Sequence, residues 1–414
     1  MFLPTIAAGG HTTHFIDVDK KCWACGCNRN RKLGKHTGKW NNKNFVFVGD
    51  LLPDVQLVSA GMNHTLFLDS DGQVWGCGEA EHQQRYKRPP ESPRSPNAPP
   101  ERIVDRQFPN LGKISLISCG DNFSVALTEE GQVHVMGQIV PIEQILAQPT
   151  CMPTSTAIKY LSCGKYHLMF LDVEQQIWGL GSNAAGQLGD PKVKLLQIPQ
   201  KIENLPEMIS VACGGFHTLL LDSEGAVYSC GKNSDGQLGL GDAVDRWTFE
   251  KLNFEVSFQQ IAGGGLHSLF LDQEGNAYSC GYDNDGQTGI KKEQVGIPIP
   301  DKEALRKKLK IPDKVEAAYQ VEMLKYQEAS VMLTKMHYSP RKISIGNPIL
   351  LICAGYLHSL FVDISGYLWS CGYNDMGQLG TGDCEKREIP TKIGDFTILT
   401  ILREQTVVKN ARKY

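Results

Sequence analysis

The chain has 414 residues, a formal net charge of −3 and a pI near 6.4, so the whole molecule has no electrostatic bias toward nucleic acid or anionic membranes. Apolar residues make up 41% and charged residues 21%, which is ordinary for a soluble globular protein. No apolar stretch is long enough for a membrane-spanning helix, and the start of the chain lacks the features of a signal peptide. We therefore expect a cytoplasmic protein, with the nucleus as the alternative compartment, and neither nucleic acid nor membrane as a partner.

One phrase recurs from residue 6 onward, and Val211–Gly231 (VACGGFHTLLLDSEGAVYSCG) is a complete copy. A copy predicts a short apolar strand, a turn at the first glycine, a second strand of the type Thr-Leu-Phe-Leu-Asp, a tight hairpin turn that ends in glycine, a third strand, and room for a fourth. A unit of four short strands that repeats about every 50 residues is typical of a β-propeller blade. The first glycines mark seven copies: Gly9, Gly61, Gly120, Gly164, Gly214, Gly264 and Gly355.

The histidines and cysteines fall at repeat positions, which favours a structural role over chemistry. One histidine follows the first glycine in five copies, where an imidazole can bond neighbouring backbone: His64, His167, His217, His267 and His358. The pattern Cys-x-x-Cys at Cys22 and Cys25 could hold a metal, but Cys25 is itself a repeat position and no second pair follows. We predict no catalytic residue, no metal and no cofactor.

A first insertion covers residues 82–106, with six prolines and six lysines or arginines against three acids. This composition predicts a mobile or polyproline-like loop. Ser92 and Ser95 each precede proline and are candidate phosphorylation sites. The loop is either solvated without a partner or contacts one through its basic residues, for which the candidates are Arg85, Lys87 and Arg88.

A second insertion covers residues 290–347 and predicts a basic helical segment at Asp301–Lys310 followed by a longer helix from Pro312. Val315, Tyr319, Met323 and Tyr326 fall on one stripe at helical spacing. The stripe must be covered, either by the propeller itself or by a partner. On the second reading Tyr319, Met323 and Tyr326 are partner-binding residues.

The C-terminal stretch Pro390–Leu402 is a predicted strand with no repeat phrase after it. Because the first copy begins almost without preceding chain, we expect this strand to complete the first blade and close the ring. Residues 403–414 form a basic tail, which either grips a neighbouring protein or is frayed.

The phrase Gly-x-x-His-[Thr/Ser]-Leu and the phrase Asn-x-x-Gly-Gln-Leu-Gly at Asn183–Gly189 together resemble the regulator of chromosome condensation family. The first phrase stands at Gly61–Leu66, Gly214–Leu219, Gly264–Leu269 and Gly355–Leu360. The resemblance implies an all-β, seven-bladed propeller, here a single domain over residues 1–414 with a small helical insertion between the sixth and seventh repeats.

The family's founding member is a guanine-nucleotide exchange factor for Ran, which acts through a wedge and acidic loops. The stretch after Gly137 is uncharged where that member has an acidic loop, although Asp283, Asp285 and Asp375 are acids that exchange could use. The first three copies are irregular, through drift or as a partner-binding sector. We predict a non-catalytic protein-interaction platform or a subunit of a larger assembly, with exchange on a Ran-like GTPase as the alternative.

Overall fold

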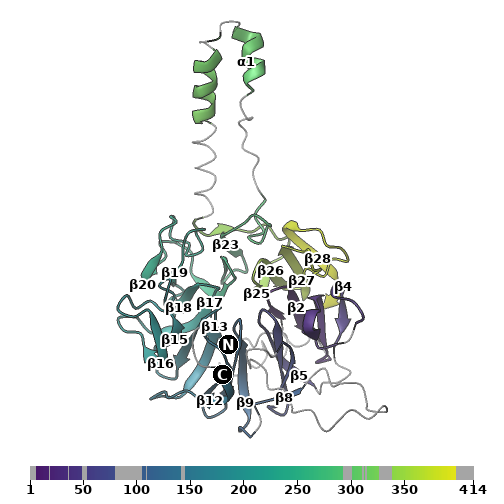
Figure 1. The fold of residues 1–414 in the computed structure, drawn as a ribbon, viewed down its shortest axis with the longest axis vertical. Coiled ribbons are helices and arrows are strands. Elements are labelled where there is room, and N and C mark those ends of the chain that lie inside the picture. The colour runs from purple at the N-terminus through teal and green to yellow at the C-terminus, as the bar shows by residue number, and fades with distance from the viewer. Residues whose placement is uncertain are drawn as a thin grey trace.

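The computed structural model describes residues 6–17, 19–35, 37–48, 54–79, 105–108, 110–140, 145–291, 301–309, 312, 315–325 and 338–397. These residues form seven four-stranded antiparallel sheets that lie around a common axis (Figure 1). The prediction of an all-β, seven-bladed propeller is confirmed.

Each blade is built from four strands that are consecutive in the chain. Blade one contains β1 (Ile6–Ala8), β2 (Thr12–Ile16), β3 (Cys22–Cys27) and β4 (Asn41–Phe47), with a short 3-10 helix η1 (Arg29–Arg31). Blade two contains β5 (Val55–Ala60), β6 (His64–Asp69), β7 (Val74–Gly78) and β8 (Asp105–Gln107). Blade three contains β9 (Ile114–Cys119), β10 (Phe123–Thr128), β11 (Val133–Gly137) and β12 (Leu146–Cys151). Blade four contains β13 (Ile158–Cys163), β14 (His167–Asp172), β15 (Ile177–Ser182) and β16 (Leu195–Lys201).

The remaining blades follow the same order. Blade five contains β17 (Met208–Cys213), β18 (His217–Asp222), β19 (Val227–Gly231) and β20 (Arg246–Lys251). Blade six contains β21 (Phe258–Gly263), β22 (His267–Asp272), β23 (Ala277–Gly281) and β24 (Arg341–Lys342). Blade seven contains β25 (Ile349–Ala354), β26 (His358–Asp363), β27 (Tyr367–Gly372) and β28 (Arg387–Thr397).

The aspartate that ends the second strand builds the hairpin to the third. In blade seven, Asp363 Oδ1 accepts the backbone N–H groups of Ser365 at 2.9 Å and Tyr367 at 3.0 Å. Its Oδ2 accepts the indole N–H of Trp369 at 2.9 Å. One buried carboxylate thus satisfies the turn and holds an aromatic side chain of the third strand, which is why the sequence couples these positions.

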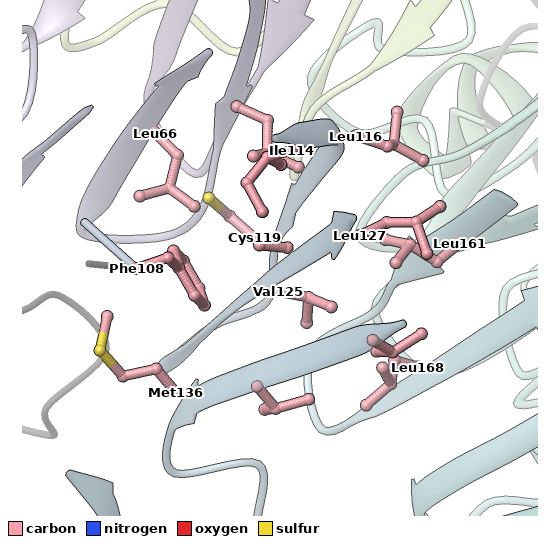
Figure 2. Packing of buried hydrophobic residues seen from close by; sticks show 14 of the residues in the cluster. Leu66, Phe108, Ile114, Leu116, Cys119, Val125, Leu127, Met136, Leu161 and Leu168 are labelled. Atoms are coloured by element: carbon pink, nitrogen blue, oxygen red, sulfur yellow. The ribbon is translucent and has the colours of Figure 1, made fainter. Parts of the chain in front are cut away.

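The hydrophobic core lies between neighbouring blades. Every residue of β18 is buried, as is every residue of β22 and of β26, because the second strand is covered on both faces of its sheet. Figure 2 shows one such layer, in which Leu66 of blade two, Val125 of blade three and Leu168 of blade four belong to a single cluster. Packing of blade against blade therefore supplies most of the apolar burial.

The predicted closure of the ring by a C-terminal strand in blade one is wrong. β28 pairs with β27, with Trp369 opposite Lys392, and so forms the outer strand of blade seven. The fourth place in blade one is already filled by β4, which follows β3 along the chain. Blades seven and one meet instead through side-chain and loop contacts, including a bond from Tyr356 N–H to the Gly9 carbonyl at 3.2 Å.

The helical insertion lies within blade six, between β23 and β24. Helix α1 (Lys302–Leu309) and the helical residues 315–325 stand together, away from the seven sheets (Figure 1). Lys302 forms an ion pair of 2.6 Å with Glu316, and its Nζ lies 5.0 Å from the centroid of the Tyr319 ring. Tyr319 of the predicted stripe thus lies against Lys302 of α1 rather than against the propeller (Figure 1).

Several predicted features lie outside the described residues: Arg85, Lys87, Arg88 and Tyr326, the loop from residue 82 to 104, and the tail at 403–414. Within the described ranges no helix is long and apolar enough to cross a membrane.

Candidate protein-binding face

The loops after the first and third strands of each blade lie side by side on one face of the propeller. Backbone bonds of 2.9 Å join them, from Lys232 N–H to the Phe216 carbonyl in blade five and from Tyr373 N–H to the Leu357 carbonyl in blade seven. We call this surface the loop face. The helical insertion follows β23, a third strand, and so leaves the propeller on the loop face.

Just below the loop face, histidines connect five of the seven blades to the next blade. His167 Nε2 lies 3.0 Å from Thr218 Oγ1, and that hydroxyl donates to the Gln187 carbonyl at 2.6 Å. Because the hydroxyl proton is used on the carbonyl, the imidazole must donate through Nε2. The predicted backbone partner is therefore replaced by a hydroxyl of the neighbouring blade.

We call this arrangement the histidine relay, and it recurs around the ring. The imidazole–hydroxyl pairs, with their distances, are His64–Ser124 at 2.9 Å, His217–Ser268 at 2.9 Å, His267–Ser359 at 2.8 Å and His358–Thr13 at 3.0 Å. Burial lowers the pKa of His167, His267 and His358 to about 3 and that of His217 to about 4. These four rings are accordingly neutral at physiological pH.

In the five blades with a relay histidine, the first glycine of the repeat makes room for its ring. A Cβ on Gly214 would overlap Cε1 of His217, and the same holds at Gly61, Gly164, Gly264 and Gly355 with their own histidines. These contacts fit the structural role that the repeat predicted for the glycines and histidines. That role remains a prediction.

Two seams lack the relay, and in both the neighbouring residues compensate. Blade three has Phe123 in place of histidine, and blade four faces it with Leu168 instead of a hydroxyl. Blade one has Thr12 in place of histidine, and the buried Lys32 crosses to blade two, with its Nζ 2.8 Å from the Met62 carbonyl. Burial lowers the pKa of Lys32. These paired changes account for part of the irregularity of the early repeats.

The three candidate acids of the loop face divide into two groups. Asp283 is buried and its Oδ1 accepts the Thr288 N–H at 3.0 Å, so it serves its own turn in the position that asparagine holds in other blades. Asp375 is exposed, and its Oδ2 accepts the hydroxyl of Tyr373 at 3.0 Å. Burial, the hydrogen bond that Tyr373 donates to Asp375, and the charges of Asp375 and Asp285 raise the pKa of Tyr373.

Asp375 and the charge of Asp285 thus both act on Tyr373, and the ring centroid of His11 lies 5.9 Å from that of Tyr373. We call these four residues the acidic cluster. Tyr373 and His11 were not predicted as site residues. The available signal was a tyrosine directly after the second repeat glycine, which occurs at Tyr282 and Tyr373.

A second group, also missed from the sequence, lies at the mouth of the axial channel. Lys165 Nζ is 5.2, 5.6 and 5.9 Å from the ring centroids of Tyr166, Phe216 and Tyr356, and 3.6 Å from Asp121 Oδ2. Burial alone would lower the pKa of Lys165, but Asp121 and the two tyrosines raise it. The group borders a small cavity of about 110 Å³ lined by the first glycines of the repeats.

On the helical insertion, Tyr319 and Met323 are half-buried, with Tyr319 beneath Lys302. Among the residues of the insertion that the structure describes, the most exposed large apolar side chains are Val321, at 55% exposure, and Leu324, at 60%. A partner would therefore meet Val321 and Leu324 before it met the predicted stripe.

The cysteines of β3 belong to the scaffold in the same way as the histidines. The Cys25 thiol donates to the Gln378 carbonyl of blade seven at 3.4 Å, and burial raises its pKa far above the ordinary range. Among the residues that the structure describes, no three His, Cys, Asp or Glu side chains are arranged to hold a metal ion.

Comparisons with known proteins agree with this architecture. The RCC1-like domain matches residues 3–324, and the regulator of chromosome condensation (RCC1) repeat matches residues 349–378 and 365–409. Among solved structures, Prp20p from Saccharomyces cerevisiae aligns with a TM-score of 0.72 and 22% identity over 92% of this chain and 88% of that one. Human WBSCR16 aligns with a TM-score of 0.67 and 18% identity over 88% of this chain and 87% of that one. At these identities the structures support the fold alone.

Curated relatives match over shorter stretches. The probable E3 ubiquitin-protein ligase HERC6 of Homo sapiens is 30% identical over 38% of this chain and 16% of its own length. The guanine nucleotide exchange factor SRM1 of Saccharomyces cerevisiae is 26% identical over 38% of this chain and 37% of its own length. The human regulator of chromosome condensation is 23% identical over 47% of this chain and 51% of its own length. The chain thus spans about half or less of these relatives, and since the RCC1-like domain matches most of it, the chain belongs to the RCC1-like domain family.

Proposed function

We propose that this propeller binds a Ran-like small GTPase on its loop face and accelerates the release of bound nucleotide. The observation that carries the proposal is the acidic cluster, in which Asp375 bonds Tyr373 and the charge of Asp285 from the neighbouring blade acts on the same side chain. One relative is named as a guanine nucleotide exchange factor, and the solved structure of Prp20p is described together with its binding to Gsp1p. These relatives support exchange better than the interaction platform that the sequence alone favoured.

The arrangement suits exchange because that reaction needs no covalent chemistry. A GTPase holds the nucleotide phosphates with a lysine, backbone N–H groups and Mg²⁺. Carboxylates brought close to that site repel the phosphates and offer the lysine another partner. Tyr373 holds one carboxylate in place through its hydroxyl, which reduces the ordering needed when the GTPase binds.

The test is the rate at which a fluorescent GDP leaves Ran and other small GTPases, with catalytic amounts of this protein. We expect faster release, and a loss of at least about tenfold in the stimulated rate with Asp285→Asn and Asp375→Asn together, which corresponds to about 1.4 kcal/mol. Asp235→Asn is the matched control, since Asp235 holds the place of Asp285 in blade five. A release rate that this protein leaves unchanged would refute the proposal.

A second candidate function, a platform for other proteins, is favoured by the helical insertion. Val321 and Leu324 are exposed on a helical pair that stands off the propeller, and α1 carries Arg306, Lys307 and Lys308. Co-purification with the wild-type chain and with a Val321→Ser, Leu324→Ser variant should give different partners. Identical partner sets would remove the insertion as a docking element.

A further inference from the structure

Blade one carries a local positive charge that the net charge of the chain conceals. Residues 28–48 contain six lysines and arginines and no acidic residue. Arg29, Lys39 and Lys43 are exposed there, and Trp40 between them is 72% exposed, the highest value among the large apolar side chains that the structure describes. The Arg29 guanidinium lies 5.6 Å from the centroid of the Trp40 ring. We call these four residues the Trp40 patch.

We propose that the Trp40 patch is a docking site for an acidic peptide segment of a partner protein. The carboxylates of that segment lie over Arg29, Lys39 and Lys43, and an apolar or aromatic side chain beside them packs on Trp40. The proposal does not rest on nucleotide exchange, because the patch shares no residue with the acidic cluster.

The backbone beneath the patch is fixed by its own bonds. Asn28 begins the loop that replaces the Asn-x-x-Gly-Gln-Leu-Gly phrase in blade one, and its side chain donates to the Lys35 carbonyl at 2.8 Å and accepts from Leu33 N–H at 3.1 Å. At the other end, the Lys43 carbonyl accepts from Gly382 N–H of blade seven at 3.0 Å. A surface held in this way loses little conformational freedom when a partner binds.

The charges of the patch are available for such a partner. Arg29, Lys39 and Lys43 form no ion pair with any residue in the described ranges. Several exposed cations without anions repel one another, so an acidic segment relieves that repulsion as it binds. Tryptophan and arginine are also the residue types that most often dominate binding energy at protein interfaces.

A peptide fits the patch better than a nucleic acid does. Single-stranded nucleic acids are held along a groove by several aromatic side chains that stack on successive bases. Here Trp40 is exposed just before β4, whereas Phe45 and Phe47 within β4 are half-buried and pack edge-on or tilted against Phe15 and Trp23. A single exposed ring, Trp40, surrounded by separate cations suits a peptide that carries one aromatic or apolar side chain flanked by carboxylates.

The neighbouring blade gives the docked segment a direction. The loop of blade seven packs on Lys43, where a Cβ on Gly377 would lie 2.7 Å from the Lys43 Cα, and this loop carries the exposed Asp375. Repulsion from Asp375 disfavours carboxylates near that seam. The most acidic end of the segment is therefore expected over Arg29 and Lys39, away from blade seven.

The test is a titration of the full chain, at about 150 mM salt so that distant charges are screened, with a synthetic peptide of Glu and Asp around one Phe. Binding is followed by calorimetry and by tryptophan emission. We expect saturable binding, weakened at least about tenfold both by Arg29→Glu, Lys39→Glu and Lys43→Glu together and by Trp40→Ala alone. Trp247→Ala is the matched control, because Trp247 is a half-exposed tryptophan on the outer strand of blade five, and it should bind like the wild type.

Three results would overturn the proposal: no saturable binding of the acidic peptide, equal binding by the charge-reversed variant, or equal binding by Trp40→Ala. A fourth is tighter binding of an oligothymidine or oligouridine than of the peptide, with the same dependence on Trp40, since that would assign the patch to nucleic acid. The Trp40→Ala variant leaves every charge in place, so its result stands even if the charge-reversed chain fails to fold.

Discussion

Mild acid should unfold this propeller, because neutral histidines are buried between its blades. His167, His267 and His358 have pKa values of about 3, and His217 of about 4, whereas an unfolded histidine titrates at 6.5. Below pH 6.5 the unfolded chain therefore binds protons that the folded chain cannot bind. The free energy of unfolding falls as the pH drops from 6.5, and the loss stops growing only near pH 3 to 4.

The size of the effect follows from the pKa difference. Each histidine costs 1.36 kcal/mol for each pH unit below 6.5, so at pH 5 one histidine costs about 2 kcal/mol and the four together about 8 kcal/mol. This approaches the whole stability of an ordinary protein, about 5–15 kcal/mol. We expect the propeller to be stable at pH 7.5 and to unfold near pH 5 or slightly below.

The seam between blades three and four provides a natural control, because Phe123 and Leu168 stand there in place of the histidine and the hydroxyl residue and neither can bind a proton. The double variant His167→Phe, Thr218→Leu copies that pair into the next seam. Urea unfolding followed by circular dichroism at pH 7.5 and pH 5 should show that the variant loses about 2 kcal/mol less than the wild type. Equal losses in the two proteins, or a wild type equally stable at both pH values, would refute the reasoning.

Three further substitutions test the scaffold by urea unfolding. Thr218→Ala leaves the His167 Nε2–H without its acceptor and the Gln187 carbonyl with only the Cys230 thiol, which should cost about 1–3 kcal/mol. No change in the unfolding midpoint would exclude the relay as a stabilising contact. Gly214→Ala places a methyl group on the His217 ring and should cost about 3 kcal/mol or more, whereas Gly346→Ala, with nothing near the added Cβ, should be almost neutral. Asp363→Ala removes the acceptor of two turn N–H groups and one indole, which should cost about 3 kcal/mol. Asp363→Thr should cost less, because Thr128 holds this place in blade three and accepts the Gln132 N–H at 3.2 Å; an equal loss would argue against the turn as the cause.

The spacing of the seven glycines was sufficient to predict the blades, because three strands of each blade carry the repeat phrase. The outer strands do not. β20 and β28 expose Trp247 and Ile389. The sequence of such an edge strand is constrained by little more than the alternation of buried and exposed side chains. The fourth strand of blade one was therefore not recognised at 41–47, and the C-terminal strand was wrongly assigned to that place.

The candidate sites were harder to predict for a different reason. Asp285 influences Tyr373 across the seam between blades six and seven, and Lys165 of blade four approaches Tyr356 of blade seven at the mouth of the axial channel. A single sequence records which residues each loop carries but not which loops share an edge. On the helical insertion the stripe through Val315, Tyr319 and Met323 was predicted correctly as the less exposed side, while its partner, α1, followed only from the structure.

The proposed exchange activity is tested most directly by complex formation with a nucleotide-free GTPase. If this protein lowers the affinity of the GTPase for GDP, then GDP must lower the affinity of the GTPase for this protein by the same factor. Gel filtration of the chain with Ran should show a stable complex when EDTA removes Mg²⁺ and nucleotide, and that complex should dissociate when GDP and Mg²⁺ are added. Equal elution with and without nucleotide, or no complex in either condition, would contradict the account.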